Sequence, residues 1–369
     1  MLQRVKSFVS NQKYWILISL IFFTLIYSTS LNFAYGVERT VGLAHFVVPD
    51  ETLEQYFPDL GSLTGFPIDT YGKNVWKLTN ASRDCGNYIL ASKQFGLGNP
   101  PYKYRILPPL IVHIMSSILQ ISVEMTYVLM NILVAYITAI FFNIYLLKDF
   151  NFSKMISFIG SILFITMTAL TGTLPFPMLD PMSFLFSILI FISVKRKNPY
   201  LFIFSSIAGV LTKEVLVISS LMWFIETMQI KDKVKTIKNI IICMVPIIVF
   251  ALVRMELGGS PFEVYFGHNP LKGNIPDLWK RLTTLGGLGY SIKMAFLSFS
   301  FLWVGIINVS KHNFFKRQII IIPIVFIAAV SLSDQITRPL GILFPIVIPM
   351  FLIFFERHTQ TTKQIIENE

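Results

Sequence analysis

Long apolar runs recur along this chain from Tyr14 to Phe355, and they restrict its fold more than any other feature. A helix that crosses a bilayer needs about 20 mostly apolar residues. Only 14% of the 369 residues are charged, whereas a soluble domain carries about 25%. The sequence therefore predicts an all-α fold, a polytopic transmembrane helical bundle of about ten spans that forms one domain over residues 1–369.

The layout of this bundle follows from the lengths of the apolar runs. The first span, 14–33, follows a basic stretch and is long for a signal peptide, so we expect an uncleaved anchor. A long outer loop with short interfacial helices is expected at 35–122, the remaining spans within 124–355, and a cytoplasmic tail at 356–369. The remaining spans are predicted at 124–147, 154–171, 181–194, 200–212, 215–229, 239–254, 286–309, 318–333 and 338–355.

Basic residues decide which side of the membrane each loop occupies. If residues 106–121 lie along the outer interface without crossing, more than half of the 31 Lys and Arg residues fall in short cytoplasmic segments. If they cross, the runs Lys195–Lys197 and Lys231–Lys235 lie outside, against the positive-inside rule. We therefore expect an interfacial or half-inserted helix at 106–121, and both termini in the cytoplasm.

A second ambiguity concerns residues 200–229, because Lys213 and Glu214 lie in the middle of this apolar stretch. A straight span would bury both charges at mid-bilayer, at about 2.5–3.5 kcal/mol each. It would also place the basic segments on its two sides in different compartments. The sequence therefore predicts a tight helical hairpin with Lys213 and Glu214 at its outer tip.

The distribution of charge argues against a nucleic-acid-binding protein, and the cysteine content argues against a protein stabilised by disulfides or by a cysteine-bound metal. The net charge of +11 suggests a nucleic-acid partner, but the basic residues concentrate in the predicted cytoplasmic loops, as they do in membrane proteins. Cys85 and Cys243 fall in a predicted loop and a predicted span, which gives neither a disulfide framework nor a metal-ligand spacing.

This topology collects ionisable residues on the outer face. Asp84 precedes a short stretch in which Tyr88, Ala91, Ser92 and Phe95 recur at helical spacing, which indicates an amphipathic helix on the membrane. Each charged residue also has a simpler interpretation. Asp84 and Asp180 suit helix caps or turns, Lys213 and Glu214 could pair with each other, Asp334 and Arg338 could form a salt bridge, and Arg105 and Arg338 could snorkel.

Four motifs in order resemble the polytopic glycosyltransferases of the GT-C type, over about residues 35–214. An acid precedes a short helix in the first outer loop (Asp84 to Tyr88), and a Tyr-Arg-x-Leu-Pro-Pro helix start follows (Tyr104 to Pro109). An Asp-Pro pair then lies in the second outer loop (Asp180-Pro181). The last motif is Gly-x-Leu-Thr-Lys-Glu (Gly209 to Glu214).

The resemblance implies inverting transfer of a sugar from a polyprenyl-phosphate-linked donor to a lipid or glycan acceptor, outside the cytoplasmic membrane. Asp84 would be the general base and Asp180 a second acid, which positions the acceptor or, with Asp84, a divalent metal such as Mg²⁺ or Mn²⁺. Phe-rich grooves between the spans would hold the prenyl tail. The donor phosphate site would comprise Arg105, Lys213, Glu214 and Arg338, and the substrate would be positioned by Tyr88, Tyr104 and Asp334.

Alternatives stay open at this stage. The chain is short for this family, lacks the large C-terminal soluble domain of many members and has a lone Asp84 where many have paired acids, so an inactive relative is one alternative. A lipid-linked sugar flippase or transporter would instead place ionisable residues near the bilayer midplane and show inverted repeats. A polysaccharide polymerase or ligase would carry its large outer loop later in the chain. A structural or assembly protein without catalysis is the fourth.

Overall fold

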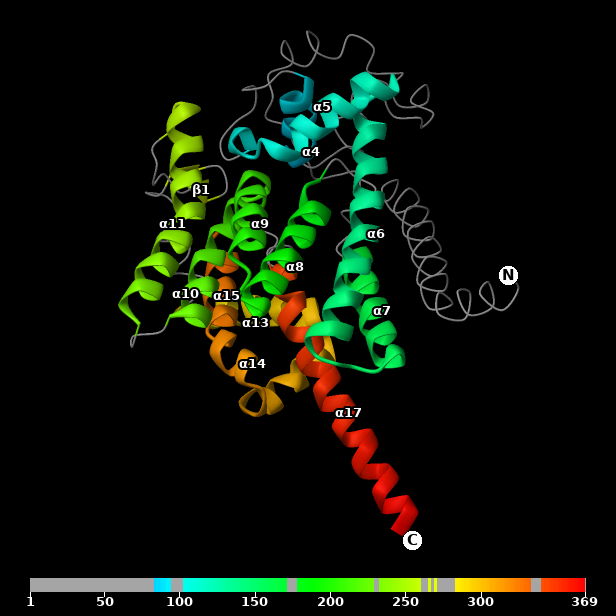
Figure 1. The fold of residues 1–369 in the computed structure, drawn as a ribbon. Helices are drawn as coiled ribbons and strands as arrows, with labels where there is room; N and C mark the ends of the chain where they lie inside the picture. The colour runs from blue at the N-terminus through cyan, green and yellow to red at the C-terminus, as the bar shows by residue number, and fades with distance from the viewer. Residues whose placement is uncertain are drawn as a thin grey trace, which may run out of the picture.

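The computed structural model describes residues 83–93, 102–170, 178–228, 232–259, 265–266, 269–270, 283–332 and 340–368. Within these residues the chain is helical except for one two-residue antiparallel pair, β1 (Tyr265–Phe266) and β2 (Asn269–Pro270) (Figure 1). The predicted all-α class is therefore confirmed. The predicted first span at 14–33 and the outer turn with Asp334 and Arg338 lie outside the described residues.

The first described elements form a layer across one end of the bundle. They are α4 (Arg83–Lys93), the 3₁₀ helix η2 (Tyr102–Tyr104) and α5 (Leu107–Leu119). Figure 1 shows α4 and α5 lying across the ends of the long helices, and α5 contacts both α6 and α9. Pro108 lies in the first turn of α5, where the N–H that it lacks has no helical partner to lose.

The bundle itself is built around α8. Every residue from Asp180 to Val194 except Leu185 is buried, which is the pattern of a helix enclosed by others on all sides. It packs against α6 on one side and α9 on the other. The helices of this half are α6 (Val123–Asp149), α7 (Lys154–Leu170), α8 (Asp180–Arg196), α9 (Pro199–Thr212), η3 (Glu214–Ile218), α10 (Ser219–Thr227) and α11 (Lys233–Glu256).

The predicted hairpin between 200 and 229 is present. The rings of Phe202 in α9 and Trp223 in α10 lie 4.5 Å apart, and a Cβ on Gly209 would lie 3.1 Å from Leu216. The sequence midpoint of each contacting pair lies between Thr212 and Lys213, so the chain reverses direction there. Lys213 is extended, with φ −155° and ψ 122°, and the return arm begins as the 3₁₀ helix η3.

The later part of the chain departs from the predicted spans. The expected continuous helix at 286–309 is wrong, because α13 (Leu285–Phe299) ends at Ser300, whose φ is +48°. A 3₁₀ helix, η4 (Ser300–Lys311), follows and packs along α17. Gly305 in η4 lies against the backbone of α17, where an added Cβ would be 2.7 Å from the Cα of Phe351. This close backbone approach is a tertiary contact with no local sequence signal.

The remaining predicted spans are helical with shifted bounds. Within the predicted span 318–333, residues 321–332 form α15 after the end of α14, and within 338–355, residues 341–355 form η5 and the start of α17. The last helix runs through most of the predicted tail at 356–369. These elements are α14 (Asn313–Gln318), α15 (Ile321–Leu332), η5 (Gly341–Leu343) and α17 (Phe344–Asn368).

Charged side chains gather at the two ends of α8. At its C-terminal end, Arg196 donates two hydrogen bonds of 2.8 Å to Asp149, and Arg317 donates one of 3.0 Å to Glu226. The residues at its N-terminal end are described in the next section. The 17 residues of α8 separate the two groups by roughly 25 Å at 1.5 Å per residue.

Two described helices are long and apolar enough to cross a membrane, Met125–Asp149 and Lys233–Glu256. Half of the apolar window in the first is buried within the bundle, against 11% in the second. A long core helix of a soluble protein meets the same criterion, so these two do not establish the predicted ten spans. The shorter apolar helices are Leu107–Leu119, Lys154–Thr168, Pro199–Thr212 and Gly341–Glu356.

The packing of η4 on α17 predicts the effect of a substitution at Gly305. We expect Gly305→Ala to lower the free energy of unfolding by about 1–3 kcal/mol, because the new methyl group meets backbone atoms that cannot turn aside. The measurement is thermal unfolding of the purified full-length chain in detergent. Gly286→Ala is the matched control, since nothing lies within 4 Å of its added Cβ. Equal melting temperatures for the two variants would contradict the η4–α17 contact.

Candidate active site

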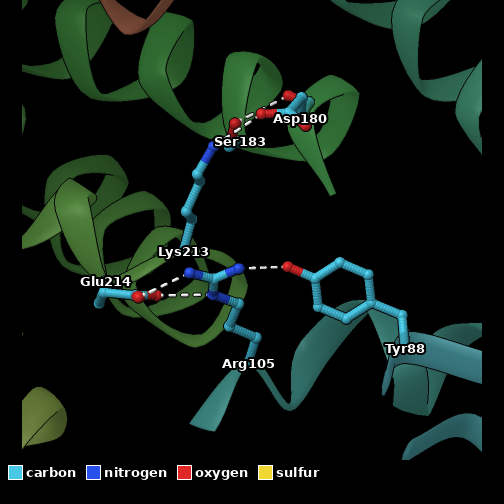
Figure 2. Close-up of polar contacts among 6 residues, drawn as sticks. All are labelled: Tyr88, Arg105, Asp180, Ser183, Lys213 and Glu214. Atoms are coloured by element: carbon cyan, nitrogen blue, oxygen red, sulfur yellow. Dashed lines mark hydrogen bonds and ion pairs between the residues drawn. The ribbon is translucent and has the colours of Figure 1, made fainter. Parts of the chain in front are cut away.

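The turn of the hairpin directs Lys213 toward the start of the central helix. Its Nζ lies 2.6 Å from Oδ1 of Asp180 (Figure 2). The Asp180 side chain is completely buried, and that of Lys213 is 12% exposed. Asp180 lies in the first turn of α8, where the helix dipole stabilises a carboxylate. The Lys213 ammonium balances the remaining cost of burying this acid.

The next residue, Glu214, pairs with a different element. Nε of Arg105 donates to Oε2 at 2.8 Å, and Nη2 donates to Oε1 at 2.7 Å, which is the bidentate arrangement. Nη1 of the same guanidinium donates to the Tyr88 hydroxyl, and Figure 2 shows Arg105 between these two partners. The guanidinium carbon also lies 5.3 Å from the centre of the Tyr102 ring. Arg105 therefore connects the hairpin turn to α4.

The Glu214 carboxyl is held in its ionised form. Burial raises its pKa, but the charge of Arg105 and its hydrogen bonds, together with the charge of Arg254, outweigh burial and lower the pKa to about 2. The carboxylate therefore stays charged from weakly acidic to alkaline pH. Protonation of Glu214 does not release Arg105 anywhere in that range.

The position of Tyr88 is set by contacts further along α4. The Ser92 hydroxyl lies 2.9 Å from the Tyr127 hydroxyl, which donates to the Tyr88 carbonyl at 3.2 Å. A ring nitrogen of His113 lies 2.8 Å from the Ser92 carbonyl. These contacts fix α4 against α5 and α6. Asp84 lies one helical turn before Tyr88, in the first turn of α4, and its side chain is outside the described part of the chain.

A third basic residue, Arg254, lies beside this group and was not among the predicted site residues. It is 3% exposed in the last turn of α11. Its guanidinium carbon lies 4.2 Å from the centre of the Phe250 ring and 5.0 Å from that of Tyr104. The sequence places Arg254 at the end of a predicted span, where a lone arginine is typical of an interfacial anchor. Only the fold shows that Arg254 is buried close to two aromatic rings, and this is what marks it as a candidate site residue.

The structure thus brings five of the predicted site residues together. Asp180, Lys213, Glu214, Arg105 and Tyr88 form one connected group. Lys213 and Glu214 each bond to another element, in place of the mutual ion pair that was considered. Tyr104 is buried next to this group and contacts Arg254. Arg338 and Asp334 lie outside the described residues.

The described donors do not fit the metal role that was considered for Asp180. Its Oδ1 is bonded to the Lys213 ammonium, which would repel a divalent cation at the same oxygen. Within the described ranges, no three His, Cys, Asp or Glu side chains gather as metal ligands do.

Below the hairpin turn lies a small apolar cavity. Its walls come from α8, η3, α10, α15 and η5, and Ser187 and Ser219 are its polar lining residues. Phe191 is its one aromatic lining residue. A Phe-rich groove for a prenyl tail therefore remains a prediction.

Comparison with protein-family models, with curated proteins and with solved structures finds no match for this chain. The chemistry of the site therefore rests on its geometry. Two basic residues are held at one end of an apolar bundle by carboxylates, and a competing anion can exchange with a carboxylate on a guanidinium.

Double substitution tests the buried Asp180–Lys213 pair. We expect Asp180→Asn or Lys213→Met to destabilise the chain by about 3–5 kcal/mol, because each leaves one charge buried without its partner. The combined variant should recover most of this loss. Unfolding of the full-length chain in detergent measures all three, with Lys235→Gln as the control. Lys235 and its partner Asp232 are 69% and 40% exposed, so its loss should cost about 0–1 kcal/mol. Additive losses in the double variant would show that the two residues are not coupled.

Proposed function

We propose that this chain is a membrane glycosyltransferase that moves a sugar from a polyprenyl-phosphate-linked donor to a lipid or glycan acceptor, at the outer face of the cytoplasmic membrane. The observation that carries the proposal is the meeting of Arg105 and Lys213 with the acids Asp180 and Glu214 at one end of an apolar helical bundle. Such a transfer needs a cation to receive the leaving phosphate and a carboxylate to accept the proton of the attacking hydroxyl.

The apolar surface of α11 supports placement in a membrane. Large apolar side chains are exposed along its whole length, from Val234 through Ile241 and Ile248 to Met255. A soluble protein rarely leaves so continuous an apolar surface in water. The two groups of charged residues, separated by roughly 25 Å along α8, also suit the two faces of a hydrocarbon layer about 30 Å thick. The transverse position of α5 supports an interfacial helix at 106–121.

In this proposal the acceptor oxygen attacks the anomeric carbon on the face opposite the phosphate. The new bond forms as the bond to the phosphate oxygen breaks, and that oxygen keeps the electron pair. Asp84 takes the acceptor proton, and Asp180 positions the acceptor. Arg105 and Lys213 receive the phosphate, for which a planar guanidinium is the better bidentate partner. Tyr88 holds Arg105 in place through its hydroxyl.

The distribution of charge favours an enzyme over a flippase or transporter. Carriers place ionisable groups near the bilayer midplane, where the substrate binds. The ion pairs of the described residues instead lie at the ends of the helices, between Arg105 and Glu214 at one end and between Arg196 and Asp149 at the other.

Loss of the two proposed catalytic acids is the direct test of activity. We expect Asp84→Asn and Asp180→Asn to abolish the glycan product in the native host. An amide at position 84 cannot take the acceptor proton, and an amide at position 180 leaves the Lys213 ammonium without its carboxylate partner. Glycan profiling is read beside the amount of protein in the membrane. Asp149→Asn, which alters an arginine-bonded acid at the opposite end, is the control and should leave the product unchanged. Normal glycans in the Asp84→Asn strain at normal protein levels would refute the catalytic assignment.

Chemical labelling of α11 tests the membrane placement. Lys235→Cys and Glu256→Cys put a thiol at each end of this helix, in a background where Cys85 and Cys243 are replaced by Ser. We expect a membrane-impermeant maleimide to label position 256 in intact cells, and position 235 only after permeabilisation, because the helix separates the compartments. Equal labelling of both positions in intact cells would overturn the placement.

A further inference from the structure

Arg254 has the surroundings of a binding residue, and the proposed catalytic steps do not use it. It is buried at the end of α11, and its guanidinium lies close to the rings of both Phe250 and Tyr104. The backbone beyond it folds back, since Gly259 N–H donates to the Arg254 carbonyl at 2.7 Å. A Cβ on Gly259 would lie 2.9 Å from Cζ of Tyr104, so this turn holds the Tyr104 ring closely against the arginine.

Arg254 and Arg105 act on the same carboxylate. Tyr104, which contacts Arg254, is the neighbour of Arg105 in the chain, and Arg105 is bonded to Glu214. The charge of Arg254 contributes to the lowered pKa of Glu214. Lys103 is turned toward the same end of α11, where its Nζ donates to the Leu257 carbonyl at 2.8 Å. The segment Lys103–Arg105 therefore joins the end of α11 to the hairpin turn.

This arrangement is better suited to a phosphate group than to another carboxylate. A guanidinium presents donors in a planar fork that matches two oxygens of either anion, but a phosphate has further oxygens for a second arginine. The two neighbouring aromatic rings restrict the orientation of Arg254, which reduces the entropy that binding would otherwise remove. The exposed apolar surface of α11 leads to this end of the helix, so a lipid chain can lie along it.

We propose that Arg254 and Arg105 together bind the phosphate group of a lipid phosphate, and that Glu214 occupies Arg105 until the phosphate displaces it. The inference rests on the proposed function in that it names the residues that receive the phosphate of the donor. It adds Arg254 as a positioning residue for this anion. It also makes Glu214 a competitor of the ligand.

Binding of farnesyl phosphate to the full-length chain in detergent tests this inference. We expect farnesyl phosphate to bind, and farnesol, which lacks the phosphate, not to bind measurably. Inorganic phosphate should bind far more weakly than farnesyl phosphate, and so should a phosphatidylglycerol headgroup without acyl chains. Equal binding of farnesol and farnesyl phosphate would overturn the proposal, and so would equal binding of inorganic phosphate and farnesyl phosphate.

Substitutions then assign the site. Arg254→Gln should weaken farnesyl phosphate at least about tenfold, a loss of one good charge-assisted contact. Arg254→Lys keeps the charge without the planar fork, so its affinity for farnesyl phosphate should lie between those of Arg254→Gln and the wild type. It also tests the site if Arg254→Gln does not fold. Arg317→Gln removes an arginine bonded to a glutamate at the opposite end and should not change the affinity. Wild-type affinity of both Arg254 variants would refute the site.

Glu214→Gln separates this role from a purely structural one. If Glu214 competes with the ligand, the Glu214→Gln variant should bind farnesyl phosphate more tightly than the wild type does. If the Arg105–Glu214 pair merely holds the fold, the same variant should bind it more weakly, and the proposal is wrong. Failure of the catalytic proposal looks different, because Asp84→Asn would leave both the glycans and the phosphate affinity unchanged.

Discussion

The structure depends on how the chain compensates two opposite charges at an apolar turn. Lys213 has extended backbone dihedrals, and successive side chains of an extended segment point to opposite sides. Lys213 therefore reaches Asp180 at the start of α8, while Glu214 reaches Arg105 before α5. Because each charge needs a partner away from water, one turn joins the hairpin, the central helix and the layer formed by α4 and α5.

The two charged ends of the bundle differ in what they contribute. At the far end, the Arg196 and Arg317 side chains are 40% and 50% exposed, while the acids that they bond, Asp149 and Glu226, are each 7% exposed. At the hairpin end, Asp180 is completely buried. A buried ion pair is often no more stable than an apolar replacement of the same volume. Stability therefore explains the Asp180–Lys213 pair poorly, which supports the proposed binding role of the hairpin end.

Features with a local physical cause could be predicted from the sequence. Apolar length indicated the helices, and the cost of burying Lys213 and Glu214 indicated the hairpin. Features that depend on distant contacts could not. The break at Ser300 accompanies the packing of Gly305 on α17. Arg254 is a candidate site residue only because the fold brings the Tyr104 ring against it. The sequence also indicated that acids and bases would share one end, but not that Glu214 bonds Arg105 across 109 residues.

The low pKa of Glu214, about 2, determines how Arg105 can be released. Protonation would neutralise the carboxylate only in strong acid, so a change of pH within the physiological range leaves the pair intact. In our proposal, a competing anion is what frees Arg105. A phosphate that takes Arg105 from Glu214 also loosens the bond between the hairpin turn and α5, because that bond passes through the same guanidinium. In the proposed exchange, anion binding would therefore be coupled to the position of the α4–α5 layer.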